Sequence, residues 1–202
     1  MKSAEIWAAV VAIVIGGPLV YVFARAMAEG QVRTREAPMR AILGDQAYEA
    51  LASGDRSEMN YMGDDRRAPD FSLPDKDGHH WRLEDHRGKV VIMNFWSITC
   101  RPCVEEMPTL IELADMLEGR DDVEVVTVTV DESWSQVASL FPRDTSLKVL
   151  FDPEKEVVRG RFGTRLYPET WFIDPDGIIR LRVDGPRDWS SPVILDLIGA
   201  LK

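Results

Sequence analysis

The chain has 202 residues, of which 45% are hydrophobic, and a formal net charge of -10 at pH 7. This length suits one domain with an extension, and the hydrophobic content is sufficient for a core. The acidic balance argues against nucleic acid as a partner, because such a surface repels phosphate. Neither an internal repeat nor a low-complexity tract is evident in the sequence, and we expect a monomer.

The first informative segment is an apolar stretch from Ile6 to Phe23, which contains 18 uncharged residues. A helix of this length would span roughly 27 Å, close to the hydrocarbon thickness of a bilayer. The small residues Ala26-Met27-Ala28 behind it resemble a signal-peptide cleavage site, but the apolar core of such peptides is shorter, about 7–15 residues. We therefore expect an uncleaved membrane anchor over residues 1–24, with secretion after cleavage as the lesser alternative.

The charges around this segment favour a C-terminal domain in the cytoplasm, whereas the family resemblance described below places it outside. Only Lys2 and the amino terminus precede it, whereas four cations follow it, Arg25, Arg33, Arg35 and Arg40. The positive-inside rule alone would therefore keep the C-terminal part in the cytoplasm. Long domains can be translocated regardless of flanking charge, so we give more weight to the family resemblance described below.

Residues 25–67 are dominated by polar and charged side chains, with glycines at intervals, and are expected to form a tether. Apolar residues between Pro38 and Ala52 recur at helical spacing, which predicts one short amphipathic helix. We assign this helix a structural role, either docked on the domain or extending the reach from the membrane. From Ala68 the pattern becomes dense and regular, so residues 68–202 are expected to be the folded domain.

The elements expected in this domain follow from apolar periodicity and turn residues. In chain order they are a hairpin at 68–83, a strand at 89–96, a helix at 103–118, a strand at 123–130, a helix at 133–141, a strand at 148–151, a helix at 154–162, strands at 170–174 and 178–183, and a helix at 191–201. Early βαβ units followed by a ββα ending predict a mixed sheet with helices on both faces.

Both cysteines of the chain, Cys100 and Cys103, lie in one CxxC pair where a strand gives way to a helix. Two thiols at this spacing can close and open a small disulfide ring without moving the backbone. Cys100 falls at the helix N-terminus, where orphan N–H groups and the helix dipole favour a thiolate, and Arg101 adds a cation. Cys103, one turn into the helix, would be shielded. We therefore expect thiol–disulfide exchange in which Cys100 attacks and Cys103 resolves.

Two other interpretations of the pair have less support. A structural zinc site needs four ligands, and the chain adds only His79, His80 and His86, which lie together upstream. A static structural disulfide is the second alternative, and Pro102 inside the ring at a strand-to-helix junction argues against it. We expect no metal, and no cofactor other than the redox-active disulfide itself.

Four motifs occur in the order typical of a known family. They are APDFSLPDKDG at 68–78, GKVVIMNFW at 88–96, CRPCVEEMP at 100–108 and YPETWFID at 167–174. The chain thus resembles thioredoxins, and more narrowly the TlpA/ResA-like membrane-anchored family of the redoxin superfamily. The resemblance covers residues 68–202. It implies an α/β, thioredoxin-like fold with a central mixed β-sheet flanked by helices, an N-terminal β-hairpin addition and an N-terminal membrane helix.

The resemblance also assigns residues to a site around the cysteines. Pro168 matches the cis-proline that lies opposite the CxxC pair and offers backbone hydrogen bonds to a bound substrate strand. Tyr167 precedes it, where many relatives carry Thr or Val. Trp96, four residues before Cys100, could frame the active-site surface or belong to the core. We assign these three residues to substrate binding together with Arg101 and Pro102.

Glu106 matches the carboxylate of the family's CxxCxxExP pattern. A partly buried carboxylate one turn beyond Cys103 could accept and return the proton of that thiol. Asn94 stands where thioredoxin itself has a buried acid, and an amide cannot transfer a proton in this way. Glu106 is therefore the expected catalytic proton partner.

The resemblance implies a reductase of protein disulfides that works outside the cytoplasm. The substrates that it suggests are apocytochrome c thiols before haem attachment, or copper-site cysteines of an oxidase, with a membrane thiol reductase as electron donor. The protein would then be a single-pass cell-membrane protein with its thioredoxin-like domain on the periplasmic side. Whether the protein reduces or oxidises its substrates depends on the stability of the reduced thiolate and on the partner that restores the redox state of the cysteine pair.

Two rival functions remain open at this point. A thiol peroxidase of the redoxin superfamily would use a PxxxTxxC arrangement, but Ser97 stands three positions before Cys100 and the proline is absent. A non-enzymatic copper chaperone or tethered binding module of this fold would use a wider CxxxC pair and a distant histidine, and neither is present. Insulin reduction with a Cys100→Ser control separates these classes.

Overall fold

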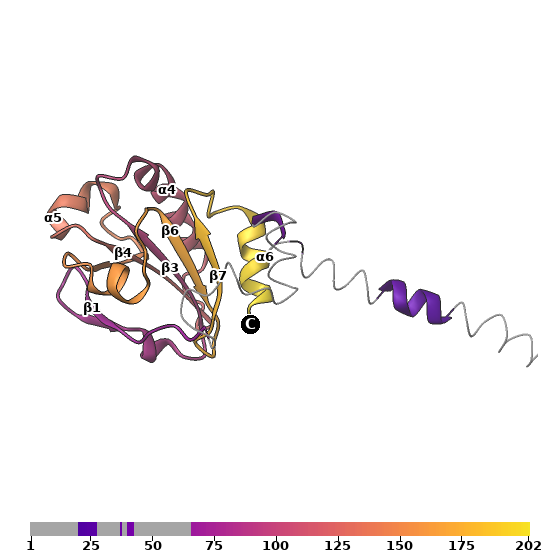
Figure 1. The fold of residues 1–202 in the computed structure, drawn as a ribbon. Helices are drawn as coiled ribbons and strands as arrows, with labels where there is room; N and C mark the ends of the chain where they lie inside the picture. Colours follow the sequence, from indigo (N-terminus) through magenta and orange to yellow (C-terminus); the bar gives the residue numbers. More distant parts are fainter. Residues whose placement is uncertain (1–19, 28–36, 38–39, 43–65) are drawn as a thin grey trace, which may run out of the picture.

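The computed structural model describes residues 20–27, 37, 40–42 and 66–202. A five-stranded sheet lies at the centre of the domain (Figure 1), with its strands in the order β5-β4-β3-β6-β7. These strands are β3 (Val90–Trp96), β4 (Val123–Thr129), β5 (Lys148–Phe151), β6 (Glu169–Ile173) and β7 (Ile179–Asp184). β3, β4 and β5 run parallel, β6 is antiparallel to β3, and β7 is antiparallel to β6. The predicted mixed sheet is confirmed.

The central strand β3 is buried along its whole length. Its sequence is an apolar run interrupted only by Asn94, as expected for a strand that is covered on both faces. Because successive side chains of a strand point to opposite faces, Trp96 belongs to one hydrophobic cluster and Phe95 to the other. β3 ends at Trp96, so the segment with the cysteines begins at this edge of the sheet.

Helices cover one face of the sheet, and a second small sheet helps to cover the other. The first face packs against α4 (Arg101–Met116), α5 (Trp134–Val137), η4 (Ala138–Leu140) and α6 (Pro192–Ala200). The second face packs against β1 (Ser72–Pro74), β2 (His80–Arg82), η3 (Leu83–His86) and η5 (Glu156–Arg161). β1 and β2 pair antiparallel in a separate two-stranded sheet. The core therefore consists of two layers, one on each side of β3.

The helix that carries the cysteines begins two residues earlier than the sequence predicts, at Arg101 instead of 103. Pro102 occupies its first turn, where a missing N–H leaves no helical hydrogen bond unmade. Cys100 is the N-cap residue, with extended backbone angles of φ -89° and ψ 100°. This is the position that the sequence predicts for it, at the positive end of the helix.

The segment expected to be an ordinary helix at 154–162 is a wide helical turn, η5, in which Phe162 N–H bonds Val157 C=O five residues back. A single buried carboxylate lies before this turn and binds its first N–H groups. Asp152 accepts hydrogen bonds from the N–H groups of Glu156, Val157 and Val158 at 2.8–3.0 Å. Apolar periodicity carries no signal of this arrangement.

The N-terminal region is described only in part. Residues 20–27 and 40–42 are helical, and Ile42 packs, partly buried, against the cluster that contains the α6 side chains. Figure 1 shows this turn beside α6. Most of the expected anchor at 1–24 and of the tether at 25–67 falls outside the described residues. Within the described part, none of the helices has both the length and the apolar character needed to cross a membrane.

Candidate active site

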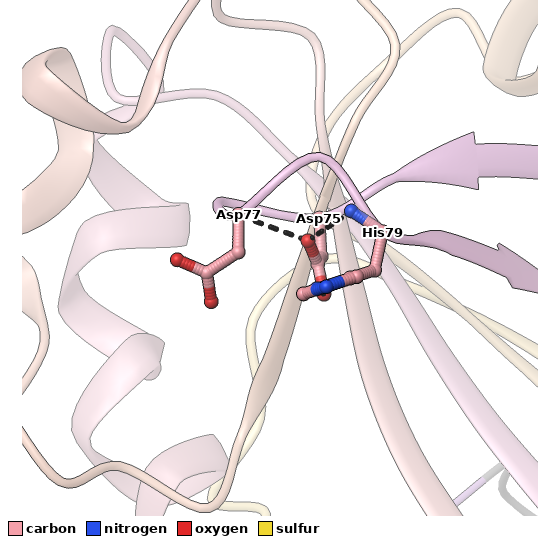
Figure 2. Close-up of side chains that lie close together, drawn as sticks. All are labelled: Asp75, Asp77 and His79. Carbon is pink, nitrogen blue, oxygen red and sulfur yellow. Dashed lines mark hydrogen bonds and ion pairs between the residues drawn. The ribbon is translucent and has the colours of Figure 1, made fainter.

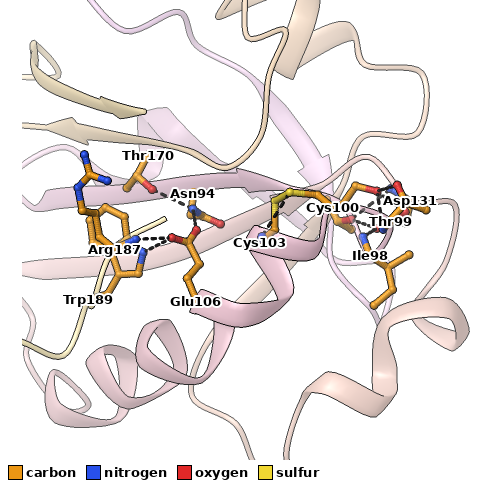
Figure 3. The surroundings of a disulfide bond; sticks show 12 residues. Asn94, Ile98, Thr99, Cys100, Cys103, Glu106, Asp131, Thr170, Arg187 and Trp189 are labelled. Carbon is orange, nitrogen blue, oxygen red and sulfur yellow. Dashed lines mark hydrogen bonds between the residues drawn. A yellow bond between two sulfur atoms is a disulfide. The ribbon is translucent and has the colours of Figure 1, made fainter. Parts of the chain in front are cut away.

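The two cysteines form a disulfide at the N-terminal end of α4, with their Cα atoms 5.3 Å apart (Figure 3). Cys103 is completely buried, whereas Cys100 is partly exposed. The Cys100 sulfur accepts a hydrogen bond from the Cys103 N–H at 3.3 Å. Backbone N–H donors at a helix start stabilise negative charge on a capping sulfur. The exposure of the two thiols thus has the predicted order.

One carboxylate fixes the loop that leads into Cys100. Asp131, two residues beyond β4, accepts hydrogen bonds from the Ile98 N–H at 2.7 Å and from the Ser97 hydroxyl at 2.9 Å. The Thr129 hydroxyl donates to the same carboxylate at 2.5 Å. Because these partners belong to the ends of neighbouring strands, Asp131 ties the cysteine loop to β4. No motif in the sequence predicts this role for Asp131.

Glu106 lies further along α4, and it is 3% exposed. One of its oxygens accepts from the Asn94 side-chain amide at 3.0 Å. The other accepts from the Arg187 backbone N–H at 3.0 Å and from the Trp189 indole N–H at 2.9 Å. Figure 3 shows Glu106 and Cys103 on neighbouring turns of α4, with the Asn94 amide beside the carboxylate. The expected carboxylate is therefore near the buried thiol.

Burial raises the pKa of Glu106 above its usual value, because desolvation disfavours the charged form. The three hydrogen bonds from Trp189, Arg187 and Asn94 oppose this effect, since each stabilises the carboxylate, but they do not cancel it. The pKa of Glu106 is therefore closer to the usual pKa of a thiol than that of an exposed glutamate is. A group with these properties can take a proton from Cys103 and give it back.

Asn94 connects this carboxylate to the neighbouring strand. Its side-chain amide also donates to the Thr170 hydroxyl on β6 at 2.8 Å. Its Oδ1 atom is buried and has no hydrogen-bond partner among the described residues. No sequence motif predicts the contacts of Trp189 and Thr170, because these residues lie 83 and 76 positions from their partners.

The peptide bond between Tyr167 and Pro168 is cis, as the resemblance implies. The next residue, Glu169, pairs with Phe95 in the sheet, so Pro168 lies level with Trp96, where the chain turns toward the cysteines. The Pro168 carbonyl accepts a hydrogen bond from the Gly185 N–H at 2.9 Å, which holds it on the β7 side. The turn before β6 therefore lies at the edge of the sheet from which the cysteine loop starts.

Three residues assigned to substrate binding have different positions. Trp96 is completely buried, with its ring centroid 5.8 Å from that of Phe141, so the predicted contact of its side chain with substrate is wrong. Apolar packing at the end of β3 outweighs its nearness to the motif. Pro102 is exposed at the start of α4. Arg101 is also exposed, but its Nε donates to Glu105 at 2.8 Å, so this ion pair offsets its charge.

A second buried carboxylate, Glu169, immediately follows the cis-proline and is 4% exposed. It accepts a hydrogen bond from the Thr164 hydroxyl, and the Nε of Arg182 lies 3.8 Å from its other oxygen. Desolvation raises its pKa, while Thr164 and Arg182 oppose that effect. Its neighbour Thr170 contacts Asn94, so Glu169 points to the opposite face of the sheet.

A separate group of titratable side chains, Asp75, Asp77 and His79, forms the turn between β1 and β2 (Figure 2). The Asp75 carboxylate accepts from the N–H groups of Asp77 and His79, both at 2.9 Å. Desolvation raises the pKa of Asp75, but these two hydrogen bonds and the nearby charges of His79 and Lys76 together outweigh it, so its pKa is below the usual value. These bonds are an Asx turn, and this local structural role accounts for the arrangement.

The part of the chain that carries most of this site matches a known protein family. The model of the AhpC/TSA family matches residues 65–182, which is more than half of the chain. The chain belongs to this family. Thiol-disulfide oxidoreductase ResA of Geobacillus thermodenitrificans is 34% identical over 119 residues, which are 58% of this chain and 67% of that protein. Thioredoxin-like protein YneN of Bacillus subtilis is also 34% identical over 119 residues, 57% of this chain and 68% of that protein.

Solved structures agree with these relatives. A thiol:disulfide interchange protein described as DsbE from Chlorobium tepidum superposes with a TM-score of 0.59 at 27% identity, over 70% of this chain and 99% of that one. The exposed lipoprotein thioredoxin Etrx1 of Streptococcus pneumoniae gives a TM-score of 0.56 at 30% identity, over 66% of this chain and 100% of that one. The thioredoxin-like fold is confirmed, and the protein is a thiol–disulfide oxidoreductase of the ResA/DsbE type.

Proposed function

We propose that this oxidoreductase reduces protein disulfides outside the cytoplasm, with Cys100 as the attacking thiol and Cys103 as the resolving thiol. The observation that carries the proposal is the asymmetry of the pair. Cys100 is partly exposed and caps α4, whereas Cys103 is completely buried on the same helix as the buried carboxylate of Glu106. A substrate can reach only the first sulfur, and the proton partner lies on the side of the second.

The reaction has two exchange steps. In the reduced protein, the Cys100 thiolate attacks one sulfur of the substrate disulfide, so a mixed disulfide forms and the other substrate sulfur leaves and takes up a proton. Cys103 then gives its proton to Glu106 and attacks the Cys100 sulfur. The mixed disulfide breaks, the Cys100–Cys103 bond forms, and the second substrate sulfur leaves as a thiolate that takes up the proton from Glu106. Two electrons pass to the substrate, with one proton from Cys103 by way of Glu106 and one from water, and an external dithiol must return the electrons.

The turn before the cis-proline supports a second part of the proposal, that Tyr167 and Pro168 hold an extended substrate segment. None of the hydrogen bonds within residues 66–202 uses a backbone group of residues 165–167. Free N–H and C=O groups can pair with an added strand. The turn lies level with the end of β3, where the cysteine loop begins, so a segment bound there would bring its disulfide toward Cys100.

We also propose a periplasmic, single-pass membrane protein that receives electrons from a membrane thiol reductase. The family resemblance supports this proposal. A further support is the helix at 20–27, where Val20, Tyr21, Val22 and Phe23 are all more than 60% exposed. Apocytochrome c or copper-site proteins are the proposed substrates, on the same resemblance. A reporter fused after Lys202 should read out in the periplasm, and a cytoplasmic readout would overturn the proposed location.

The proposed exchange is tested by trapping. Cys103→Ser leaves the attacking thiol without its resolving partner, so mass spectrometry should find protein substrates joined to Cys100 by stable mixed disulfides. Cys100→Ser is the matched control and should trap none, and it should also abolish insulin reduction. Insulin reduction that persists in Cys100→Ser would contradict the proposal. Turnover of hydrogen peroxide instead of a disulfide would support the peroxidase alternative, and copper binding without turnover would support the chaperone.

A further inference from the structure

The turn before the cis-proline is closed by a contact between its two ends. The Thr164 hydroxyl donates to the Glu169 carboxylate, and both residues are at least 95% buried. The Thr164 N–H is also fixed, to the Val158 carbonyl at 3.0 Å. We call residues 165–167 the clasped loop, because this contact holds their flanks together. Such a loop presents its side chains in a defined position.

The clasped loop directs one side chain inward and two outward. Tyr167 is partly buried and packs against both hydrophobic clusters of the core. Arg165 and Leu166 are exposed. Leu166 is 82% exposed, more than any other large hydrophobic side chain of the described residues. The contacts of Tyr167 thus anchor the loop to the core, while Leu166 faces the solvent.

The same part of the chain carries positive charge in an otherwise acidic protein. The chain has 34 acidic and 24 basic residues, yet residues 157–168 contain three arginines and no acidic residue. These arginines are Arg159, Arg161 and Arg165. Across the described residues, none of the three takes part in a salt bridge. This segment therefore offers cationic groups that are not neutralised within the domain.

We propose that Arg165 and Leu166 select the substrate, and that the clasped loop binds an extended segment carrying a carboxylate and an apolar side chain next to its cysteine. Free backbone groups, an exposed apolar side chain and an unpaired guanidinium stand on consecutive residues, at the edge of the sheet where the cysteine loop begins. An acidic and apolar segment satisfies all of them at once, because it covers Leu166 and pairs with Arg165. The inference rests on the proposed exchange function and narrows its substrate class.

The test uses two synthetic disulfide peptides that differ only beside the reacting cysteine, where one carries Asp-Leu and the other Lys-Ser. The full chain should show a KM on the order of tenfold lower for the Asp-Leu peptide, a preference that falls at high salt because screening weakens charge pairing. Arg165→Glu should reverse the preference, and Leu166→Ser should raise the KM for the Asp-Leu peptide only. Turnover of hydroxyethyl disulfide, which is small and uncharged, should be unchanged in both variants.

Arg143→Glu is the matched control, because Arg143 is exposed and the substitution changes the net charge equally. It should leave the preference intact, and a reversal equal to that of Arg165→Glu would overturn the proposal. Equal KM values of the wild-type chain for the two peptides would also overturn it. If the wild-type chain fails to turn over hydroxyethyl disulfide, the proposed exchange function itself is wrong. If the chain turns over hydroxyethyl disulfide but has equal KM values for the two peptides, only the proposed substrate selectivity is wrong.

The clasp gives an independent test. Thr164→Val keeps the shape of the side chain but removes the hydroxyl that binds Glu169. If the clasp positions the loop, this variant should raise the KM for the Asp-Leu peptide while leaving the kcat for hydroxyethyl disulfide unchanged. Thr164→Ser should restore the wild-type KM, because it restores the donor. A rise in KM that Thr164→Ser shares would contradict the positioning role.

Discussion

Glu106 and Glu169 are two buried carboxylates on opposite faces of one sheet, and their partners differ. Both have a pKa raised by desolvation. Glu106 is held by three N–H donors from β3 and from the segment before α6. Glu169 is held by a hydroxyl and by the cation of Arg182. The first can change its charge without breaking an ion pair, whereas the second would lose one, so only Glu106 suits proton transfer.

The largest expected effect comes from Glu106→Gln, which removes the proton acceptor. The step in which Cys103 resolves the mixed disulfide should slow by about 10²–10⁴-fold, the usual contribution of a positioned acid or base. Stopped-flow measurement of substrate release across a pH range checks this, and the acidic inflection of the profile should disappear. Glu169→Gln is the matched control and should keep that inflection. Loss of the inflection in both variants would contradict the distinction.

A smaller effect is expected from Trp189→Phe, which removes one donor to Glu106. With one hydrogen bond fewer, the pKa of Glu106 should rise further, and the inflection should move to higher pH. The buried acceptor left behind should lower the free energy of unfolding by about 1–3 kcal/mol, measured in urea. Trp171→Phe is the control, because Trp171 is an equally buried tryptophan in the cluster on the other face of the sheet. It should destabilise the fold without moving the inflection.

The smallest effect concerns stability against pH. The folded-state pKa of Glu106 lies above its usual value of 4.5, so the folded protein holds this proton more tightly than the unfolded chain does. This contribution to stability is complete below about pH 4.5 and is lost as the pH rises through the raised pKa. Unfolding by urea at several pH values should show a shallower decline over this window in Glu106→Gln. An identical decline in the two proteins would show that Glu106 does not titrate there.

The parts of the site that could be predicted are those encoded by residues close together in the sequence. Residue spacing around the CxxC pair placed Cys100 at a helix start and Glu106 on the same helix, and the motif at 167–174 placed the cis-proline. Trp96 was misjudged because a residue near the motif can still point into the core. Asp131, Trp189 and Glu169 were not identified as site residues. Their partners come from other elements, so only the folded arrangement shows their function.

The amide of Asn94 has a further consequence for the proton that Glu106 exchanges. In the structure it donates to both Glu106 and Thr170, while its own oxygen has no partner within the described part of the chain. A protonated Glu106 is itself a donor, and half a turn of the amide would then offer it the Asn94 oxygen. An aspartate at this position would repel the carboxylate, whereas asparagine can complement either charge state. Asn94 thus allows Glu106 to gain and lose its proton without a rearrangement of the surrounding core.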